Sequence, residues 1–250
     1  MKRIIKSFVG LTLAVSIVVS SPMQAQAGFF DWLFGRNKNQ DIVVNTGAEF
    51  EAEMLAVDPV IGPDNPPKET IFKANQYYYK TGLSCPKQAT YSKYKLLERV
   101  RKGDIIYEAL GAGGIAGHIA IVEGVYDRGD GTKYIRLIEA IGDGGVCRSI
   151  LDDKRADDKA AYVLRVKGAD QGIINRAVDF CVAQLGKAYR LDFKHDYNRY
   201  EAHWYCSEVV WAAYFVQGIN VETTGSLNEQ GITPRDIYRC DLTVTIPHKR

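Results

Sequence analysis

The sequence predicts an α+β fold in which a mostly antiparallel sheet packs against helices. Two apolar-rich runs, residues 118–127 and 133–141, flank the segment RGDGT, which is typical of a β-hairpin turn. Further short apolar runs lie on both sides of this hairpin. From Ile174 onward the apolar residues recur at helical spacing. Helices, then strands, then helices is an order typical of α+β layer folds.

Local patterns predict the other elements in turn. A helix is expected over 67–80, with Pro67 in its first turn, and another over 92–103, with Ser92 as N-cap and Gly103 at its end. Apolar runs predict strands, and helical spacing ended by glycine predicts the later helices. The predicted strands are 103–110, 146–151, 161–166 and 242–246, and the later helices are 174–185, 203–218 and a short turn at 232–238.

The first 27 residues have the organisation of a secretory signal peptide. A basic segment, MKRIIK, precedes the apolar FVGLTLAVSIVVSS and the small-residue site AQA, which ends at Ala27. An uncleaved membrane anchor is the alternative, but the apolar stretch is short for a spanning helix and Pro22 closes it. We therefore expect an exported protein, periplasmic or secreted after cleavage near Ala27.

The rest of the chain is expected to form a leader, residues 28–66, and one catalytic domain, residues 67–250. The aromatic leader segment GFFDWLFG could contact a membrane, but packing on the domain or staying mobile is the favoured interpretation. Loss of the three signal-peptide cations changes the net charge from +2 to −1. With no basic tract, the mature chain is not expected to bind nucleic acid.

The five cysteines have different predicted roles. Cys181 lies on the apolar face of a predicted helix and is expected to be a core residue. Cys85, Cys147 and Cys240 could supply one disulfide after export, with the pairing left open. No CxxC or His/Cys cluster has zinc-site spacing, so no metal or other cofactor is expected.

Cys206 is the candidate nucleophile, because it opens a predicted helix. A helix N-terminus favours the thiolate, and a neighbouring imidazole can accept the thiol proton. His118 opens a predicted strand and is the candidate base, while Glu139 is the candidate residue that orients it. The alternatives are an inert Cys206 thiol, a solvated Glu139 on an edge strand, and His203 as the base.

The hairpin brings His118 and Glu139 close together. With the turn centred near residues 129–130, antiparallel pairing places His118 opposite roughly position 140, so Glu139 falls near His118 on the paired strand, within about one residue of register error. A slip of one residue would reverse the face on which Glu139 lies. A carboxylate in the apolar run LIEAI is unfavourable without a partner, and His118 is the expected partner.

Six motifs occur together in one order: GDIIYEA, GHIAIVEGVY, LIEAIGDGGV, QLGKAYRLDF, YCSEVVWAAY and ITPRDIY. This set resembles the circularly permuted NlpC-type papain-like cysteine peptidases, and within them the YiiX-like group, over roughly residues 90–245. The resemblance implies a papain-like fold with the nucleophile at a helix N-terminus. It assigns Cys206 as nucleophile, His118 as base and Glu139 as the third polar residue. Tyr189 and Tyr205 are candidates for lining the substrate cleft, with packing as their alternative role.

Three functions are compatible with these residues. The first is an exported cysteine hydrolase, an amidase or peptidase that acts on a small peptide or amino-acid amide such as a peptidoglycan fragment. The second is a lipid acyltransferase or thioesterase resembling lecithin retinol acyltransferase, for which the aromatic leader would suit a membrane surface. The third is a binding protein of the same fold without activity. The presence of all three site residues favours an enzyme.

Overall fold

The computed structural model describes residues 91, 95–109, 117–127, 131–151, 155, 161–223 and 231–247. The signal peptide, the leader, the predicted helix over 67–80, Cys85 and His248 lie outside the described residues. The expectations for those segments therefore stay predictions.

A six-stranded antiparallel sheet forms the centre of the molecule, with the strand order β4-β3-β2-β1-β5-β8. Its strands are β1 (Ile105–Glu108), β2 (His118–Asp127), β3 (Lys133–Ile141), β4 (Gly145–Ile150), β5 (Ala161–Val166) and β8 (Thr243–Ile246). The sheet confirms the predicted fold class.

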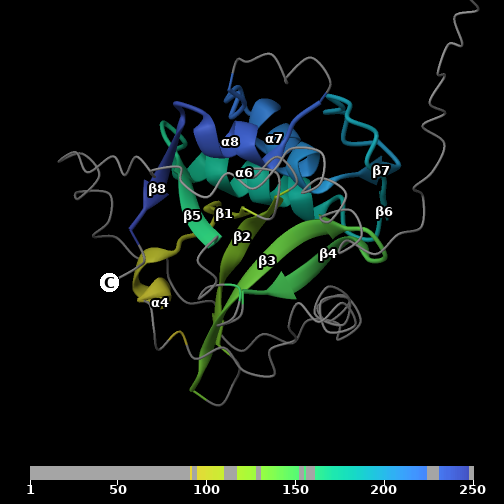
Figure 1. The fold of residues 1–250 in the computed structure, drawn as a ribbon. Helices are drawn as coiled ribbons and strands as arrows, with labels where there is room; N and C mark the ends of the chain where they lie inside the picture. The colour runs from red at the N-terminus through yellow and green to blue at the C-terminus, as the bar shows by residue number, and fades with distance from the viewer. Residues whose placement is uncertain are drawn as a thin grey trace, which may run out of the picture.

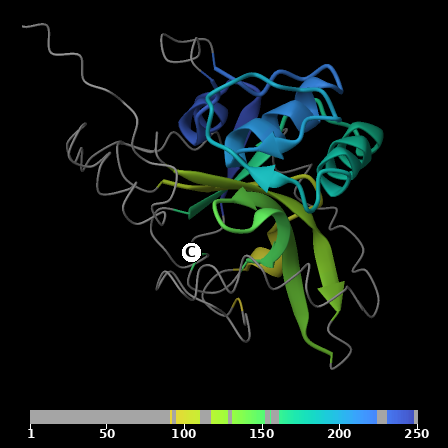
Figure 2. The same ribbon diagram turned by 90° about the vertical axis from the view of Figure 1, so that its right-hand side faces the viewer.

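The helices lie mainly on one side of this sheet, as Figures 1 and 2 show. That layer consists of α6 (Gln171–Val182), α7 (Cys206–Phe215) and α8 (Pro234–Arg239), and the short α4 (Leu96–Arg99) packs near β3 from the other side. A small parallel pair, β6 (Ala188–Tyr189) and β7 (His203–Trp204), precedes α7. Within the described ranges, no helix has the length and apolar character needed to cross a bilayer.

Strand alternation divides the core into two clusters. In β2, Ile119 and Ile121 pack in the cluster that contains α7, whereas Ala120 and Val122 pack in the cluster that contains α4. Helix α7 is buried along its whole length from Cys206 to Tyr214. A helix that is apolar on all sides is a central helix. Each fully buried large side chain in these clusters contributes about 1.5–3 kcal/mol to stability.

Two predicted helices are shorter in the structure than the sequence patterns indicate. The helix predicted over 92–103 ends at Arg99, because the chain turns there into β1. Asp104 accepts hydrogen bonds from the Arg101 N–H (2.8 Å) and from Arg165 (2.8 Å), which holds this turn. Gly103 adopts φ 82° with the Tyr214 hydroxyl donating to its carbonyl oxygen (2.6 Å), and a Cβ there would lie 2.9 Å from that hydroxyl.

The prediction of a helix over 203–218 was wrong for its first three residues, which precede α7. His203 and Trp204 pair with Ala188 and Tyr189 as strand β7, so α7 begins at Cys206. Tyr205 is extended, with φ −109° and ψ 169°, and is the N-cap. The later start matters because it puts Cys206 at the first helical position.

Candidate active site

Cys206 is the first residue of α7, and its thiol is at the end of the helix where backbone N–H groups are unpaired. The helix is anchored there by Glu208, whose carboxyl group accepts from the backbone N–H of Asp196 (3.1 Å) and weakly from that of Tyr205 (3.4 Å). Cys206 is buried, with 7% of its surface exposed. The positive end of the helix dipole favours a negative charge at this position.

His118 is the first residue of β2 and lies between Cys206 and Glu139. Its Nε2 hydrogen-bonds to Oε2 of Glu139, and the ring also shares a hydrogen bond with Cys206. With Nε2 bonded to Glu139, Nδ1 is the ring nitrogen available to the thiol. The three residues named from the sequence thus form one continuous chain, Cys206, His118 and Glu139.

The charges of its neighbours decide the protonation state of His118. Burial of the ring by itself opposes protonation, but the hydrogen bonds to Cys206 and Glu139 and their negative charges outweigh it and raise the pKa of His118 to about 10. The ring therefore carries a proton at neutral pH. An imidazolium beside a thiol is the arrangement that supports a thiolate–imidazolium ion pair.

Glu139 is fully buried, so the alternative of a solvated carboxylate does not hold. Its Oε1 accepts from the Ser149 hydroxyl and from Arg155 Nη1 (3.1 Å), and its Oε2 accepts from Arg155 Nη2 (3.1 Å) as well as meeting His118. Burial raises the pKa of this carboxyl, but the charges and hydrogen bonds of Arg155 and His118 lower it well below its usual range. Glu139 is therefore a carboxylate at neutral pH.

The other described histidines face other partners. The ring of His203, the alternative base, lies 3.1 Å from Oδ2 of Asp192, and the ring of His195 lies 2.9 Å from Oε1 of Glu222. Among the histidines within the described ranges, His118 is the one whose ring bonds to Cys206.

The two tyrosines singled out in the sequence differ in their surroundings. Tyr205 is 1% exposed, and its hydroxyl donates to the Lys194 carbonyl (2.7 Å) and accepts from the Ile232 N–H (3.0 Å). These contacts favour the packing role for Tyr205. Tyr189 is partly buried against the main core cluster, and its role in the cleft stays a prediction.

Sequence reasoning missed Ser149, Arg155 and Glu108. Arg155 lies within the charged run DDKRADDK, a pattern that is typical of a solvated segment. The side chain of Arg155 is nevertheless buried. Ser149 lies on β4, the strand in which Cys147 pairs with Glu139. Pairing of the two predicted strands would therefore have placed Ser149 near Glu139.

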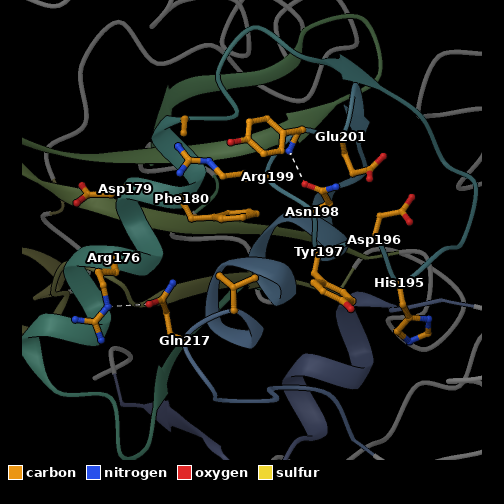
Figure 3. Close-up of a pocket in the computed structure, with 13 residues that line it drawn as sticks. Arg176, Asp179, Phe180, His195, Asp196, Tyr197, Asn198, Arg199, Glu201 and Gln217 are labelled. Atoms are coloured by element: carbon orange, nitrogen blue, oxygen red, sulfur yellow. Dashed lines mark hydrogen bonds between the residues drawn. The ribbon is translucent and has the colours of Figure 1, made fainter.

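A groove of about 860 Å³ is lined by residues of α6, of the segment 195–201 and of the turn that follows α7 (Figure 3). Arg176 of α6 donates to Gln217 across the groove (2.8 Å), and Tyr197 packs edge-on against Trp211. None of Cys206, His118 and Glu139 lines it.

Comparison with known families agrees with the fold. Residues 99–241 match the family model of the permuted papain-like amidase enzymes, YaeF/YiiX, C92 family, and the chain belongs to this family. It is accordingly a papain-like amidase-type hydrolase in the general sense of that family. No curated protein matches the chain.

A solved structure similar to this chain is that of metalloprotein yiiX from Escherichia coli O157:H7. The two share 17% sequence identity, with a TM-score of 0.41, over 60% of this chain and 97% of that one. The description as a metalloprotein applies to the yiiX protein. In the part of this chain that the structure describes, no three His, Cys, Asp or Glu side chains group together as metal ligands do.

Proposed function

We propose that this protein is an exported thiol hydrolase that cleaves amide bonds in cell-wall-type peptides or related amino-acid amides. The observation that carries the proposal is the hydrogen-bonded chain of Cys206, His118 and Glu139 at the N-terminus of α7. A buried carboxylate, an imidazolium and a thiol in this order are the parts of a nucleophilic acyl-transfer site.

The first half of the reaction forms an acyl-enzyme. The Cys206 thiolate attacks the amide carbonyl carbon, a C–S bond forms, and the carbonyl electron pair moves onto oxygen. Backbone N–H groups at the start of α7 stabilise that oxyanion. His118 donates its proton to the amide nitrogen, the C–N bond breaks, and the amine leaves.

The second half releases the acid. His118, now neutral, accepts a proton from water, and the resulting hydroxide attacks the thioester carbonyl. The C–S bond breaks and the electron pair returns to sulfur, which restores the Cys206 thiolate beside a protonated His118. Through both halves Glu139 holds the imidazole in one orientation and stabilises its positive charge.

The substrate class rests on the family and on the signal-peptide pattern. The family is one of amidases, and export would place the enzyme where cell-wall peptides are found. A mature net charge near −1 does not favour a polyanionic substrate.

The test compares two cysteine variants in a substrate screen. The purified wild type, Cys206→Ser and Cys181→Ser are incubated with amino-acid amides, peptidoglycan peptides and lipid esters, and released amine or acid is measured. Cys181 is the matched control because it is buried in α6, where its thiol contacts the Val209 carbonyl (3.8 Å). We expect amine release by the wild type and Cys181→Ser and none by Cys206→Ser. An acyl adduct should appear on Cys206 by mass spectrometry.

Other outcomes identify the alternatives. Release of fatty acid without amine would identify a lipid thioesterase. A folded wild type that turns over no substrate and forms no adduct would overturn the hydrolase proposal and favour a binding protein.

A further inference from the structure

Arg155 places one guanidinium between two buried carboxylates. It donates to Glu139 through Nη1 and Nη2 (both 3.1 Å) and to Glu108 through Nε (3.0 Å) and Nη2 (2.9 Å). The side chains of Arg155 and Glu139 are 5% and 0% exposed. A charged cluster this deeply buried is stable only when its charges are balanced and its hydrogen bonds are satisfied.

Arg155, Glu108 and Glu139 together span β2, the strand that carries His118. Glu139 lies on β3 and Glu108 on β1, and β2 runs between these two strands. Glu108 pairs directly with His118 through the backbone of β1 and β2. Arg155 therefore links the strands on both sides of His118.

The guanidinium also restricts the rotation of the Glu139 carboxylate. A planar fork that bonds to both oxygens holds the carboxylate in one plane. The Ser149 hydroxyl bonds to Oε1, so Oε2 is the oxygen that remains directed at His118. Without Arg155, this carboxylate would lose two of the hydrogen bonds that fix it.

The balance of charge leads to the same conclusion. Arg155 pairs with both Glu108 and Glu139, whereas the protonated His118 pairs with Glu139 and with Cys206. Removing Arg155 leaves two neighbouring carboxylates with one cation. The fully buried Glu139 is then the carboxylate for which burial most opposes ionisation.

We propose that Arg155, held by Glu108, is a positioning residue that keeps Glu139 ionised and directed at His118, and so extends the activity of the Cys206 site toward acid pH. This inference rests on the proposed function, because it concerns the same thiol site. A role limited to anchoring the chain around residue 155 to the sheet would affect stability alone.

The first experiment measures the rate of Cys206 alkylation by iodoacetamide from pH 4 to pH 8. Wild type is compared with Arg155→Met, Arg155→Gln and Arg155→Lys. In the two neutral variants we expect the acid midpoint of the rate profile to move upward by about one pH unit or more. Arg155→Lys, which restores the charge without the fork, should recover part of this shift.

Arg165→Met is the matched control. Arg165 forms a comparable buried pair with Asp104 through Nε and Nη2 (both 2.8 Å), away from the three site residues. This variant should keep the wild-type midpoint. The inference is overturned if a folded Arg155→Gln or Arg155→Met keeps the wild-type midpoint, or if Arg165→Met shifts it equally.

A second readout does not depend on the thiol. The chain has four histidines, so ring signals of the protein carrying ¹⁵N-labelled histidine can be assigned by single substitutions. At acid pH, the chemical shift of His118 Nε2 changes when Glu139 becomes protonated. The midpoint pH of this change, called here the acid step, should be higher in Arg155→Gln than in the wild type. If Cys206 of the wild type is no more reactive than an ordinary thiol, the proposed function fails. The His118 signal then still decides the inference about Arg155: an unchanged acid step overturns it.

Discussion

His118 and Glu139 lie on the same face of neighbouring strands, and their side chains meet through Nε2 and Oε2. In β2, His118 shares its alternation with Ala120, and in β3, Glu139 shares its alternation with Leu137. Both apolar residues belong to the cluster on the side away from α7. The His118 ring, at the first position of β2, therefore connects a carboxylate on one face of the sheet with a thiol from the helix layer on the other.

Replacement of Glu139 by Gln should separate geometry from charge. The amide is nearly the same size but carries no negative charge to stabilise the imidazolium. We expect the pKa of His118 to fall from about 10 toward the ordinary histidine value of about 6.5. Amidase activity at neutral pH should fall by up to about 10⁴-fold, the loss found when the carboxylate of a serine-protease triad becomes an amide.

The measurements for Glu139→Gln are the pH profile of kcat/KM and the titration of the His118 ring by NMR. Ser149→Ala serves as a control, because it removes one hydrogen bond to Glu139 and leaves the charge. Wild-type kcat/KM in a folded Glu139→Gln protein would contradict the role of Glu139 as the orienting carboxylate.

The predicted hairpin shows how far the sequence determines this site. Periodicity located β2 and β3 at their observed bounds, 118–127 and 133–141. The predicted pairing of His118 with roughly position 140 allowed a register error of about one residue, and the structure pairs Ile121 with Ile138, with an irregularity between Val122 and Gly124. The observed register puts Glu139 on the face of His118. The choice between neighbouring registers depends on this irregularity, which the alternation of apolar residues does not reveal.

Arg155 could not be predicted for a different reason. Its contacts with Glu139 and Glu108 span 16 and 47 residues of sequence, and its own neighbours are charged. Local patterns describe which face a residue takes within one element. They contain no information about which distant carboxylate a surface-like arginine will meet once the strands pair.

His118→Ala and His203→Ala form a matched pair of base variants. An ordinary thiol, with a pKa of about 8.5, is about 0.3% ionised at pH 6, so loss of an activating base can lower the alkylation rate by about 10²-fold. We expect a loss of this size at Cys206 in His118→Ala. His203→Ala should keep the wild-type rate because its ring bonds to Asp192.

The rates are measured by iodoacetamide labelling and mass spectrometry of each cysteine. Cys181 is an internal control, since burial raises the pKa of its thiol and the native protein should leave it unlabelled. If His203→Ala lost the reactivity and His118→Ala retained it, the assignment of the base would be reversed.

Glu208 should make the stability of the protein depend on pH. Burial raises the pKa of this carboxyl to about 8, and Asp192 and Asp196 add repulsion, although the N–H groups of Asp196 and Tyr205 lower it in part. The folded state therefore holds a proton that the unfolded chain releases near pH 4.5. The stability contributed by this proton is complete below about pH 4.5 and is lost as the pH rises through about 8.

Glu208→Gln removes this dependence, because the amide does not ionise. Between pH 5 and pH 9, the wild type should lose on the order of 1–2 kcal/mol more unfolding free energy than Glu208→Gln, with solvent screening taken into account. Urea denaturation at the two pH values measures the difference. Equal losses in both proteins would show that Glu208 is ionised in the folded state throughout this range.

Tyr205→Phe and Tyr189→Phe distinguish a packing residue from a residue that contacts substrate. The Tyr205 hydroxyl joins Lys194 to Ile232, so its removal leaves the buried Ile232 N–H without this acceptor. We expect a loss of about 1–3 kcal/mol in the free energy of unfolding. KM for an amide substrate should stay at its wild-type value, because the hydroxyl is occupied by the protein's own backbone. A raised KM in Tyr205→Phe with unchanged stability would instead place this hydroxyl in the cleft. KM and the free energy of unfolding of Tyr189→Phe test in the same way whether the partly exposed Tyr189 contacts substrate.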